Sequence, residues 1–428
     1  IIQATGAGGD FYIQNNTNNK DIIFKGKDDG SNITALTLDM SDAGAATFNN
    51  ALYIPDYILH VGDGNTYFGF NGTDSFQVVT GGSARLTVTD TGTAFVGTVT
   101  GATSYNGIPF FSDVANNSIY THDVSGTDDT AQNNTAYGFS TLQSITTGDN
   151  NTAIGRNAGG GINSAHNNSI LGAFAGDALT SGSHNIAVGF GALSAETTGN
   201  KNVAVGHQTL LVQNKQADAF NVAVGFEAGK AITTGTHNTI LGALAGDAMT
   251  TGSNNVALGY GALSAEDAHS FNVAIGGYSL YSQNAGANAY NTAVGYNTGF
   301  AISTGVQNTI IGGLAGDALT TGQQNVLLGY FAGGGLVEGN FNTAIGTQAL
   351  SVENAHSGNT AIGYQTLKVQ DAGADAYNTA VGHQAGLAVT TGTLNTLIGG
   401  LAGDAITTGG SNTAVGQEAL TTETTGSY

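Results

Sequence analysis

A five-residue motif of the form Asn-x-apolar-x-Gly recurs at a nearly constant spacing through most of the chain. It reads NTAIG at residues 359–363 and NTAVG at residues 378–382. The sixteen intervals between successive motifs are 17 residues in thirteen cases and 19 in three. The motif begins at Asn134, Asn151, Asn168, Asn185, Asn202, Asn221, Asn238, Asn255, Asn272, Asn291, Asn308, Asn325, Asn342, Asn359, Asn378, Asn395 and Asn412. A period this regular is typical of a solenoid with one coil per unit.

The length of the unit and its glycines favour β-structure. A unit of 17 residues has no room for a pair of helices. The Gly that ends each motif, and a second Gly three residues before many of the Asn residues, predict tight corners. The fourth motif residue is aliphatic in every coil from Asn151 onward, which predicts a strand of about five residues. At the usual strand spacing, the coils would stack into a parallel β-roll roughly 80 Å long.

The third and fourth motif residues point to opposite faces of such a strand. The fourth, as in Ile154 and Val188, is expected to face the coil interior. The third is also apolar and usually Ala, as in Ala153 and Ala187. A strand that is apolar on both faces is expected to be buried on both. The small third residue therefore predicts close contact with further copies of the chain, most simply in a parallel homotrimer.

The Asn residues of the motif are expected to stack in register. Each side-chain amide can hydrogen-bond to the amide of the neighbouring coil, so the sequence predicts a structural ladder from Asn151 to Asn412. Aspartate at the same positions would give a column of like charges.

The repeat resembles the head repeat of trimeric autotransporter adhesins, the YadA-like left-handed parallel β-roll, whose units read N-[TSV]-[AV]-[IV]-G followed by a small residue. The resemblance covers residues 134–428 and implies a trimeric parallel β-roll with an adhesive or spacer role. The coils here are longer than is usual in that family. The sequence also predicts no heptad stalk and no membrane-barrel segment.

Residues 1–130 differ from the repeat domain at 131–428. ALTLDMSDAGAATF at 35–48 and RLTVTDTGTAFVGTV at 85–99 share a form offset by 50 residues, with alternating strand-like runs between them. These segments are similar to parts of bacteriophage tail-fibre and other virion fibre proteins. The sequence thus predicts an all-β, elongated homotrimeric fibre with β-rich shaft segments followed by the β-roll. A virion tail fibre for host attachment is expected, and the alternative is the head of a bacterial cell-surface trimeric adhesin.

Composition excludes several classes of partner. The chain has 30 acidic and 9 basic residues, and the net charge of −21 disfavours nucleic acid and acidic membrane surfaces. Apolar runs are too short to span a bilayer, and no secretion leader is predicted. Since the chain has no Cys, disulfides and thiolate zinc sites are excluded. The expected partners are further copies of the chain, other virion proteins and a host-cell glycan or protein receptor.

The three 19-residue coils carry insertions that each end in an aromatic residue just before the motif: Phe220, Tyr290 and Tyr377. These residues are either rings tucked onto a surface bulge or a polar-aromatic ridge that binds a receptor. The Asp residues of the recurring AGDA segments (Asp177, Asp247, Asp317 and Asp404) are interpreted as turn or cap residues rather than calcium ligands.

Catalysis, metals and cofactors are not expected. The nine His residues lack metal-ligand spacing, and His207 and His383 are interpreted as solvated or stacked. Nucleophile, phosphate-loop and metal-binding motifs are not found. A glycan-cleaving enzyme would need a paired acid and base, and the sequence singles out no such pair. An ice-binding solenoid is the third alternative, because Thr-Thr pairs recur, but adjacent Thr residues point to opposite faces.

Overall fold

The computed structural model of the chain describes residues 2–4, 11–13, 15–39, 45–48, 57–60, 62–73, 75–89, 92–95, 111–113, 118–120 and 129–427. All regular elements in these ranges are β-strands. The described residues therefore include no helix that could cross a bilayer. The chain divides into two compact units, Ile1–Ala102 and Thr103–Tyr428, which are described separately.

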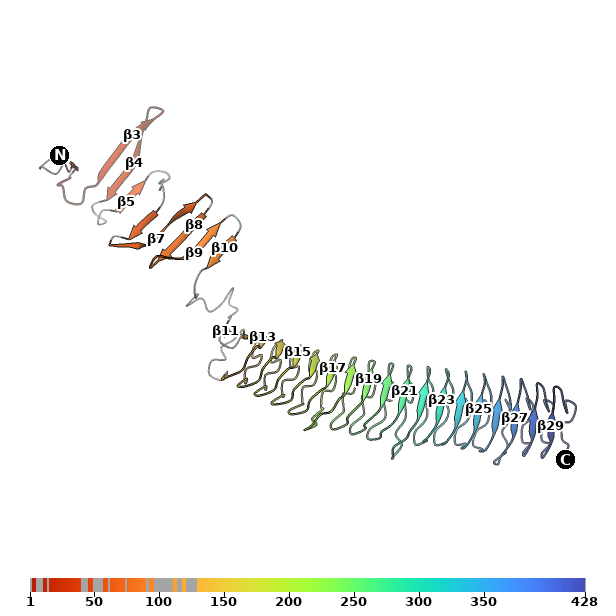
Figure 1. Ribbon diagram of the computed structural model, residues 1–428. Coiled ribbons are helices and arrows are strands. Elements are labelled where there is room, and N and C mark those ends of the chain that lie inside the picture. The colour runs from red at the N-terminus through yellow and green to blue at the C-terminus, as the bar shows by residue number, and fades with distance from the viewer. Residues whose placement is uncertain are drawn as a thin grey trace. The chain divides into compact units, whose positions relative to one another are not determined.

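The first unit consists of antiparallel strands in three small sheets (Figure 1). Its strands are β1 (Ile2–Ala4), β2 (Phe11–Ile13), β3 (Ile22–Asp28), β4 (Ser31–Asp39), β5 (Ala45–Phe48), β6 (Tyr57–His60), β7 (Asp63–Gly72), β8 (Ser75–Thr80), β9 (Ser83–Thr89) and β10 (Gly92–Phe95). The sheets are β1-β2, β3-β4-β5 and β6-β7-β8-β9-β10. The two similar sequence segments form similar hairpins, in which Leu36 pairs with Phe48 and Leu86 pairs with Phe95.

The second unit is a parallel β-solenoid. After the antiparallel pair β11 (Phe111–Asp113) and β12 (Ser118–Tyr120), every strand pairs in parallel with the next. The coil strands are β13 (Thr135–Tyr137), β14 (Thr152–Ile154), β15 (Ser169–Leu171), β16 (Ile186–Val188), β17 (Val203–Val205), β18 (Val222–Val224), β19 (Thr239–Leu241), β20 (Val256–Leu258), β21 (Val273–Ile275), β22 (Thr292–Val294), β23 (Thr309–Ile311), β24 (Val326–Leu328), β25 (Thr343–Ile345), β26 (Thr360–Ile362), β27 (Thr379–Val381), β28 (Thr396–Ile398) and β29 (Thr413–Val415). Figure 1 shows them stacked in one row along the solenoid. The predicted parallel solenoid of about seventeen coils is confirmed.

Each coil strand has three residues rather than about five, and it comprises the second to fourth motif residues. Every strand pairs in register with the equivalent residues of the next coil. This register holds even across a 19-residue coil, where Val203 pairs with Val222. The two extra residues are therefore accommodated outside the sheet, in the connection that follows the strand.

The prediction of which strand face is inward is wrong. The third motif residue, as in Ala153 and Ala187, is fully buried in the coil interior. The fourth, as in Ile154 and Leu171, faces outward and is 39% and 48% exposed. The physical reason is the narrow interior of a 17-residue coil, which has room for a small strand residue opposite the apolar side chains of the connection.

Interior packing confirms this reason, since large and small residues alternate between two interior positions. Coils with Ala as the third motif residue often have Leu eight residues after the Asn, as in Leu193 and Leu210. Coils with Ile or Leu as the third residue have Gly there instead. A Cβ at Gly159 or Gly176 would lie 3.1 or 3.3 Å from Cδ1 of Ile170. Close packing leaves no space for two large side chains at this level.

The motif Asn is buried inside each coil and joins it to its neighbours. In all sixteen successive pairs, the backbone N–H of one Asn donates to the side-chain oxygen of the preceding Asn, at 2.8–3.2 Å. In most coils the Nδ2 group also donates to a backbone carbonyl fourteen residues later; Asn308 donates to Gly322 in this way at 2.9 Å. Amide-to-amide bonds accompany these in some coils, such as Asn308 Nδ2 to Asn291 Oδ1 at 3.2 Å. Each Asn side chain thus hydrogen-bonds both within its own coil and to the next coil.

Candidate functional site

The outward face of the solenoid sheet is a candidate interaction surface that runs along the whole solenoid. It is formed by the second and fourth motif residues, which are Thr, Ser, Val, Ile or Leu in every coil from Asn151 onward; the fourth residue of the first coil is Tyr137. Several of these aliphatic side chains are substantially exposed: Ile154, Leu171, Ile186, Val222, Leu241, Ile311, Val326, Leu328, Ile398 and Val415. Contiguous exposed apolar surface of this extent marks an interaction site on a soluble protein.

The three aromatic residues of the insertions all lie at a corner with positive φ. The φ angles of Phe220, Tyr290 and Tyr377 are 53°, 53° and 50°, a conformation that bulky residues seldom adopt. Their side chains are 43–57% exposed. Because the residue before the motif Asn has positive φ in most coils, this conformation is a property of the corner and is not specific to the insertions.

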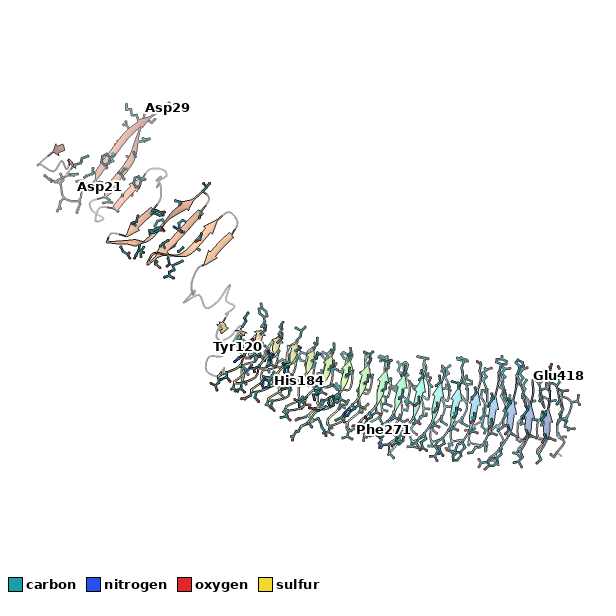
Figure 2. All side chains as sticks on the ribbon, in the orientation of Figure 1. Asp21, Asp29, Tyr120, His184, Phe271 and Glu418 are labelled. Atoms are coloured by element: carbon teal, nitrogen blue, oxygen red, sulfur yellow. The ribbon has the colours of Figure 1, made fainter. Side chains whose placement is uncertain are left out.

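Neighbouring coils cover both faces of the Phe220 ring and one face of the Tyr290 ring. Phe220 has the Lys201 ammonium 5.0 Å from its centroid, and the His237 ring is stacked 5.2 Å away. Tyr290 stacks on Phe271, labelled in Figure 2, with parallel planes and centroids 5.1 Å apart. Such stacking leaves mainly the ring edge of Phe220 for a ligand, whereas a sugar packs on a ring face.

The solenoid does not bring the three insertion aromatics together. Phe220 and Tyr290 are four coils apart, and Tyr290 and Tyr377 are five coils apart. At the usual strand spacing, these separations are about 19 and 24 Å. Tyr377 instead lies beside Gly358 of the preceding coil, where a Cβ would come within 2.6 Å of the ring. The insertions therefore offer separate contacts and no common pocket.

Other aromatic side chains form stacked columns on the solenoid surface. His207 lies between Phe190 and Phe226, with centroids 5.4 and 5.2 Å apart, and His383 stacks on Tyr364 at 5.4 Å. These two His residues are stacked, as the sequence interpretation proposed.

A buried polar connection accompanies each 19-residue coil, and the sequence interpretation did not identify it. Eleven residues after the motif Asn, the interior residue is Ile, Leu, Val or Met in most coils. In the 19-residue coils it is Gln, and in the coil before each of them it is Glu: Glu196 and Gln213, Glu266 and Gln283, and Glu353 and Gln370. The exchange of an apolar residue for Glu and then Gln in a fixed column is the signal that could have revealed it.

The Glu-Gln pairs connect the insertion to the Asn ladder. Gln370 donates to Glu353 Oε2 at 2.8 Å, and its own carbonyl accepts from Asn378 Nδ2 at 2.9 Å. Gln213 does the same between Glu196 and Asn221. In these two networks the polar groups that the longer coil buries are hydrogen-bonded. In the third, Asn291 donates to Gln283 Oε1, but Gln283 Nε2 and Glu266 Oε2 have no partner among the described residues.

Two of the four AGDA aspartates hydrogen-bond to the next coil. Asp177 and Asp247 each accept a hydrogen bond at 2.6 Å from a Ser hydroxyl 17 residues later. Asp317 has Gly at that place, and its Oδ1 is buried without a hydrogen-bond partner. Burial accordingly raises the pKa of Asp317, although its own N–H and that of Ala318 oppose the shift. Asp177 and Asp247 thus support coil stacking, whereas Asp404 Oδ1, like that of Asp317, has no hydrogen-bond partner among the described residues. The structure groups the four aspartates into no common site.

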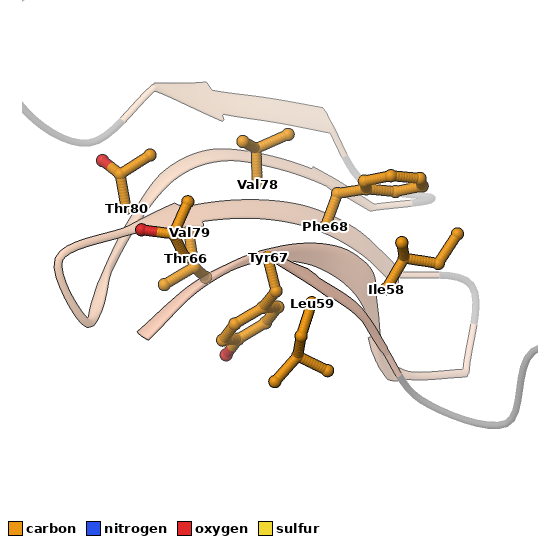
Figure 3. Close-up of a pocket in the computed structure, with 8 residues that line it drawn as sticks. All are labelled: Ile58, Leu59, Thr66, Tyr67, Phe68, Val78, Val79 and Thr80. Atoms are coloured by element: carbon orange, nitrogen blue, oxygen red, sulfur yellow. The ribbon is translucent and has the colours of Figure 1, made fainter. Parts of the chain in front are cut away.

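The first unit has an open hollow of about 330 Å³ on its five-stranded sheet (Figure 3). The lining residues come from β6, β7 and β8 and are Ile58, Leu59, Thr66, Tyr67, Phe68, Val78, Val79 and Thr80. Its polar groups are hydroxyls, and the Tyr67 hydroxyl accepts a hydrogen bond from Gln77. The hollow offers apolar contact but no acid, base or nucleophile pair.

The comparisons with known proteins give no relative from which a function could be transferred. No family model, no curated protein and no solved structure matches the chain. Arguments about function therefore depend on the surfaces described above.

Proposed function

We propose that this chain is a structural fibre protein of a virion, similar to a phage tail fibre, that forms a homotrimeric rod for host-cell attachment. The observation that carries the proposal is the apolar outward face of the solenoid sheet, which continues from coil to coil. Parallel association of three copies would remove this face from water along its whole length. The interior is already filled by each chain's own side chains, so the trimer contact is assigned to the fourth motif residue rather than the third.

Two further features support a structural role. Hydrogen bonds join every successive pair of coils through the Asn ladder, and such a repeated network is well suited to a stiff rod. The net charge of −21 is favourable for solubility and unfavourable for nucleic acid, so the proposed partners are virion proteins and a host receptor. We assign no catalytic activity to the chain.

The insertion aromatics Phe220, Tyr290 and Tyr377 are assigned to coil stacking in this proposal. A glycan or protein receptor would contact Phe220 mainly at its ring edge, because adjacent coils cover both faces, and one face of Tyr290 is covered by Phe271. The alternative function is the head of a bacterial cell-surface trimeric adhesin, and the same apolar face supports it equally. The two proposed functions differ in whether the rod is attached to a virion or to a bacterial cell surface.

Gold-labelled antibodies against residues 129–427 distinguish the two functions. In electron micrographs of a culture that produces the protein, we expect gold on the tails of virions and reduced adsorption of those virions to cells after antibody treatment. Preimmune antibodies are the control. Gold confined to bacterial envelopes would contradict the virion proposal and favour the adhesin.

A further inference from the structure

Three coils contain a buried glutamate that caps the turn following it. Oε1 of Glu196, Glu266 and Glu353 accepts the backbone N–H of the residue three positions later, at 2.7, 3.0 and 3.2 Å. All three glutamate side chains are fully buried. In the coil that contains Glu196, the N–H belongs to Gly199, so the cap needs no side chain at that position.

In the other two coils the capped residue is a histidine. Nδ1 of His269 lies 2.7 Å from Glu266 Oε1, and Nδ1 of His356 lies 2.6 Å from Glu353 Oε1. Both histidine side chains are 15% exposed, so each has an edge at the surface. Since the turn is capped without an imidazole at Gly199, capping does not explain these histidines.

A second carboxylate approaches each histidine from a different place in the fold. Asp267 Oδ1 is 3.9 Å from His269 Nδ1 and comes from the same coil. Asp371 Oδ1 is 3.7 Å from His356 Nδ1 and comes from the next coil. Each site has Asn where the other has Asp, namely Asn284 in the first and Asn354 in the second.

The imidazole and the second carboxylate occur together or are both missing. In the coil of Glu196, the equivalent positions hold Thr197, Asn214 and Gly199. Thr197 there donates a hydrogen bond to Asn214 at 2.9 Å, so the same space is occupied by a neutral contact. The three coils share the buried glutamate but differ in both of the other groups at once.

We propose that Glu266, Asp267 and His269 form one Zn²⁺ site and that Glu353, His356 and Asp371 form a second. In each cluster one ligand atom per residue lies within 4.8 Å of the others. One imidazole nitrogen and two carboxylate oxygens are a donor set that suits zinc, with the fourth position open to water. A tetrahedral ion would hold these donors about 3.3 Å apart, so each mostly exposed aspartate must approach by about 0.4–0.6 Å. Each Glu-His pair, at 2.7 and 2.6 Å, must widen by about 0.6–0.7 Å.

Among the described residues, the buried carboxylate of the first cluster has no charged group to balance Oε2. Glu266 Oε2 is buried without a hydrogen-bond partner in the described structure, and so is Gln283 Nε2, whereas in the second cluster Gln370 Nε2 donates to Glu353 Oε2. An unpaired carboxylate oxygen in the interior is costly unless a positive charge lies nearby. A cation at Oε1 supplies that charge. In the second cluster the ion would also link two successive coils, because Asp371 belongs to the 19-residue coil.

Isothermal titration of the metal-free, full-length chain with ZnCl₂ at pH 7.5 tests both sites. We expect two Zn²⁺ per chain, one in His269→Gly or His356→Gly, and none in the double variant. Glycine is chosen because Gly199 shows that the coil keeps its cap without the imidazole. His383→Ala is the control; His383 stacks on Tyr364 outside both clusters, so this variant should retain two ions. Absence of stoichiometric binding, or full binding by the double variant, would overturn the proposal.

Asp267→Asn and Asp371→Asn test the ligand sets without changing a buried residue. Each is expected to weaken Zn²⁺ binding at its own site by at least about tenfold and to leave the other site unchanged. A simple Glu-His hydrogen bond would not depend on either aspartate. Unchanged affinity in both variants, with unchanged circular dichroism, would show that the clusters are turn caps and that the assigned zinc sites are wrong.

Discussion

Gly312→Ala is expected to destabilise the solenoid by about 2–6 kcal/mol, a large effect for a single added methyl group. Gly312 ends its motif with φ at 130°, and a Cβ built there would lie 2.4 Å from the Gly329 carbonyl oxygen of the next coil. Backbone atoms cannot move aside as a side chain can, so the coils must separate locally. Urea unfolding followed by circular dichroism measures the loss.

Gly313→Ala is the matched control, one residue further along the chain. A Cβ there has only ordinary contacts, with the nearest atom of Tyr330 at 3.8 Å. Its free energy of unfolding is expected to stay within about 1 kcal/mol of the wild-type value. If both variants lose stability equally, the close approach between successive corners does not restrain the fold.

Asn255→Asp is expected to lower the free energy of unfolding by about 3–5 kcal/mol at pH 7, because it places an unpaired charge inside the coil. Asn255 is fully buried; its N–H donates to Asn238 Oδ1 at 3.0 Å and its Nδ2 to the His269 carbonyl at 2.9 Å. A carboxylate loses the second donor and faces that carbonyl with a negative charge. Thermal melts at pH 7 measure the effect.

Asn254→Asp makes the same chemical change one residue earlier. Asn254 is exposed at the corner with φ at 58°, a conformation that aspartate tolerates. Its melting temperature should differ little from that of the wild type. Similar melting temperatures for the two variants would mean that the Asn column is not a buried ladder.

Much of the fold could be predicted from the sequence because each coil repeats the same Asn-x-apolar-x-Gly motif. The spacing of the Asn residues predicted parallel coils, and the register of Val203 with Val222 shows why a 19-residue coil does not disturb them. Hydrogen bonding in a stack is local, so periodicity alone specifies which residue pairs with which.

Whether the third or the fourth motif residue faces the coil interior could not be predicted from apolarity, since both are apolar. What decides it is volume, because the interior accommodates either a large strand residue or a large connection residue. Ile170 with Gly176 and Ala187 with Leu193 illustrate the exchange. That complementarity is visible in the sequence only when the residue two positions after each motif Asn is compared with the residue eight positions after it.

The Glu-His-Asp clusters were also missed, for a different reason. Asp371 approaches His356 from the next coil, so the ligand spacing is set by the stacking and not by the sequence interval. Glu353 stands in a column that is apolar in most coils, and its burial becomes apparent only when the coils are aligned. A search for metal-binding motifs within one segment cannot find this second site, although the ligands of the first, Glu266, Asp267 and His269, do lie within one segment.

The central claim is that the outward sheet face is covered by two further copies of the chain. Multi-angle light scattering of the full-length protein tests it directly, with Leu328→Lys on that face and Thr251→Lys in an exposed connection as matched variants. We expect the wild type and Thr251→Lys to have three times the 42.9 kDa chain mass, and Leu328→Lys to shift toward smaller species. A monodisperse wild-type monomer of 42.9 kDa would contradict the account.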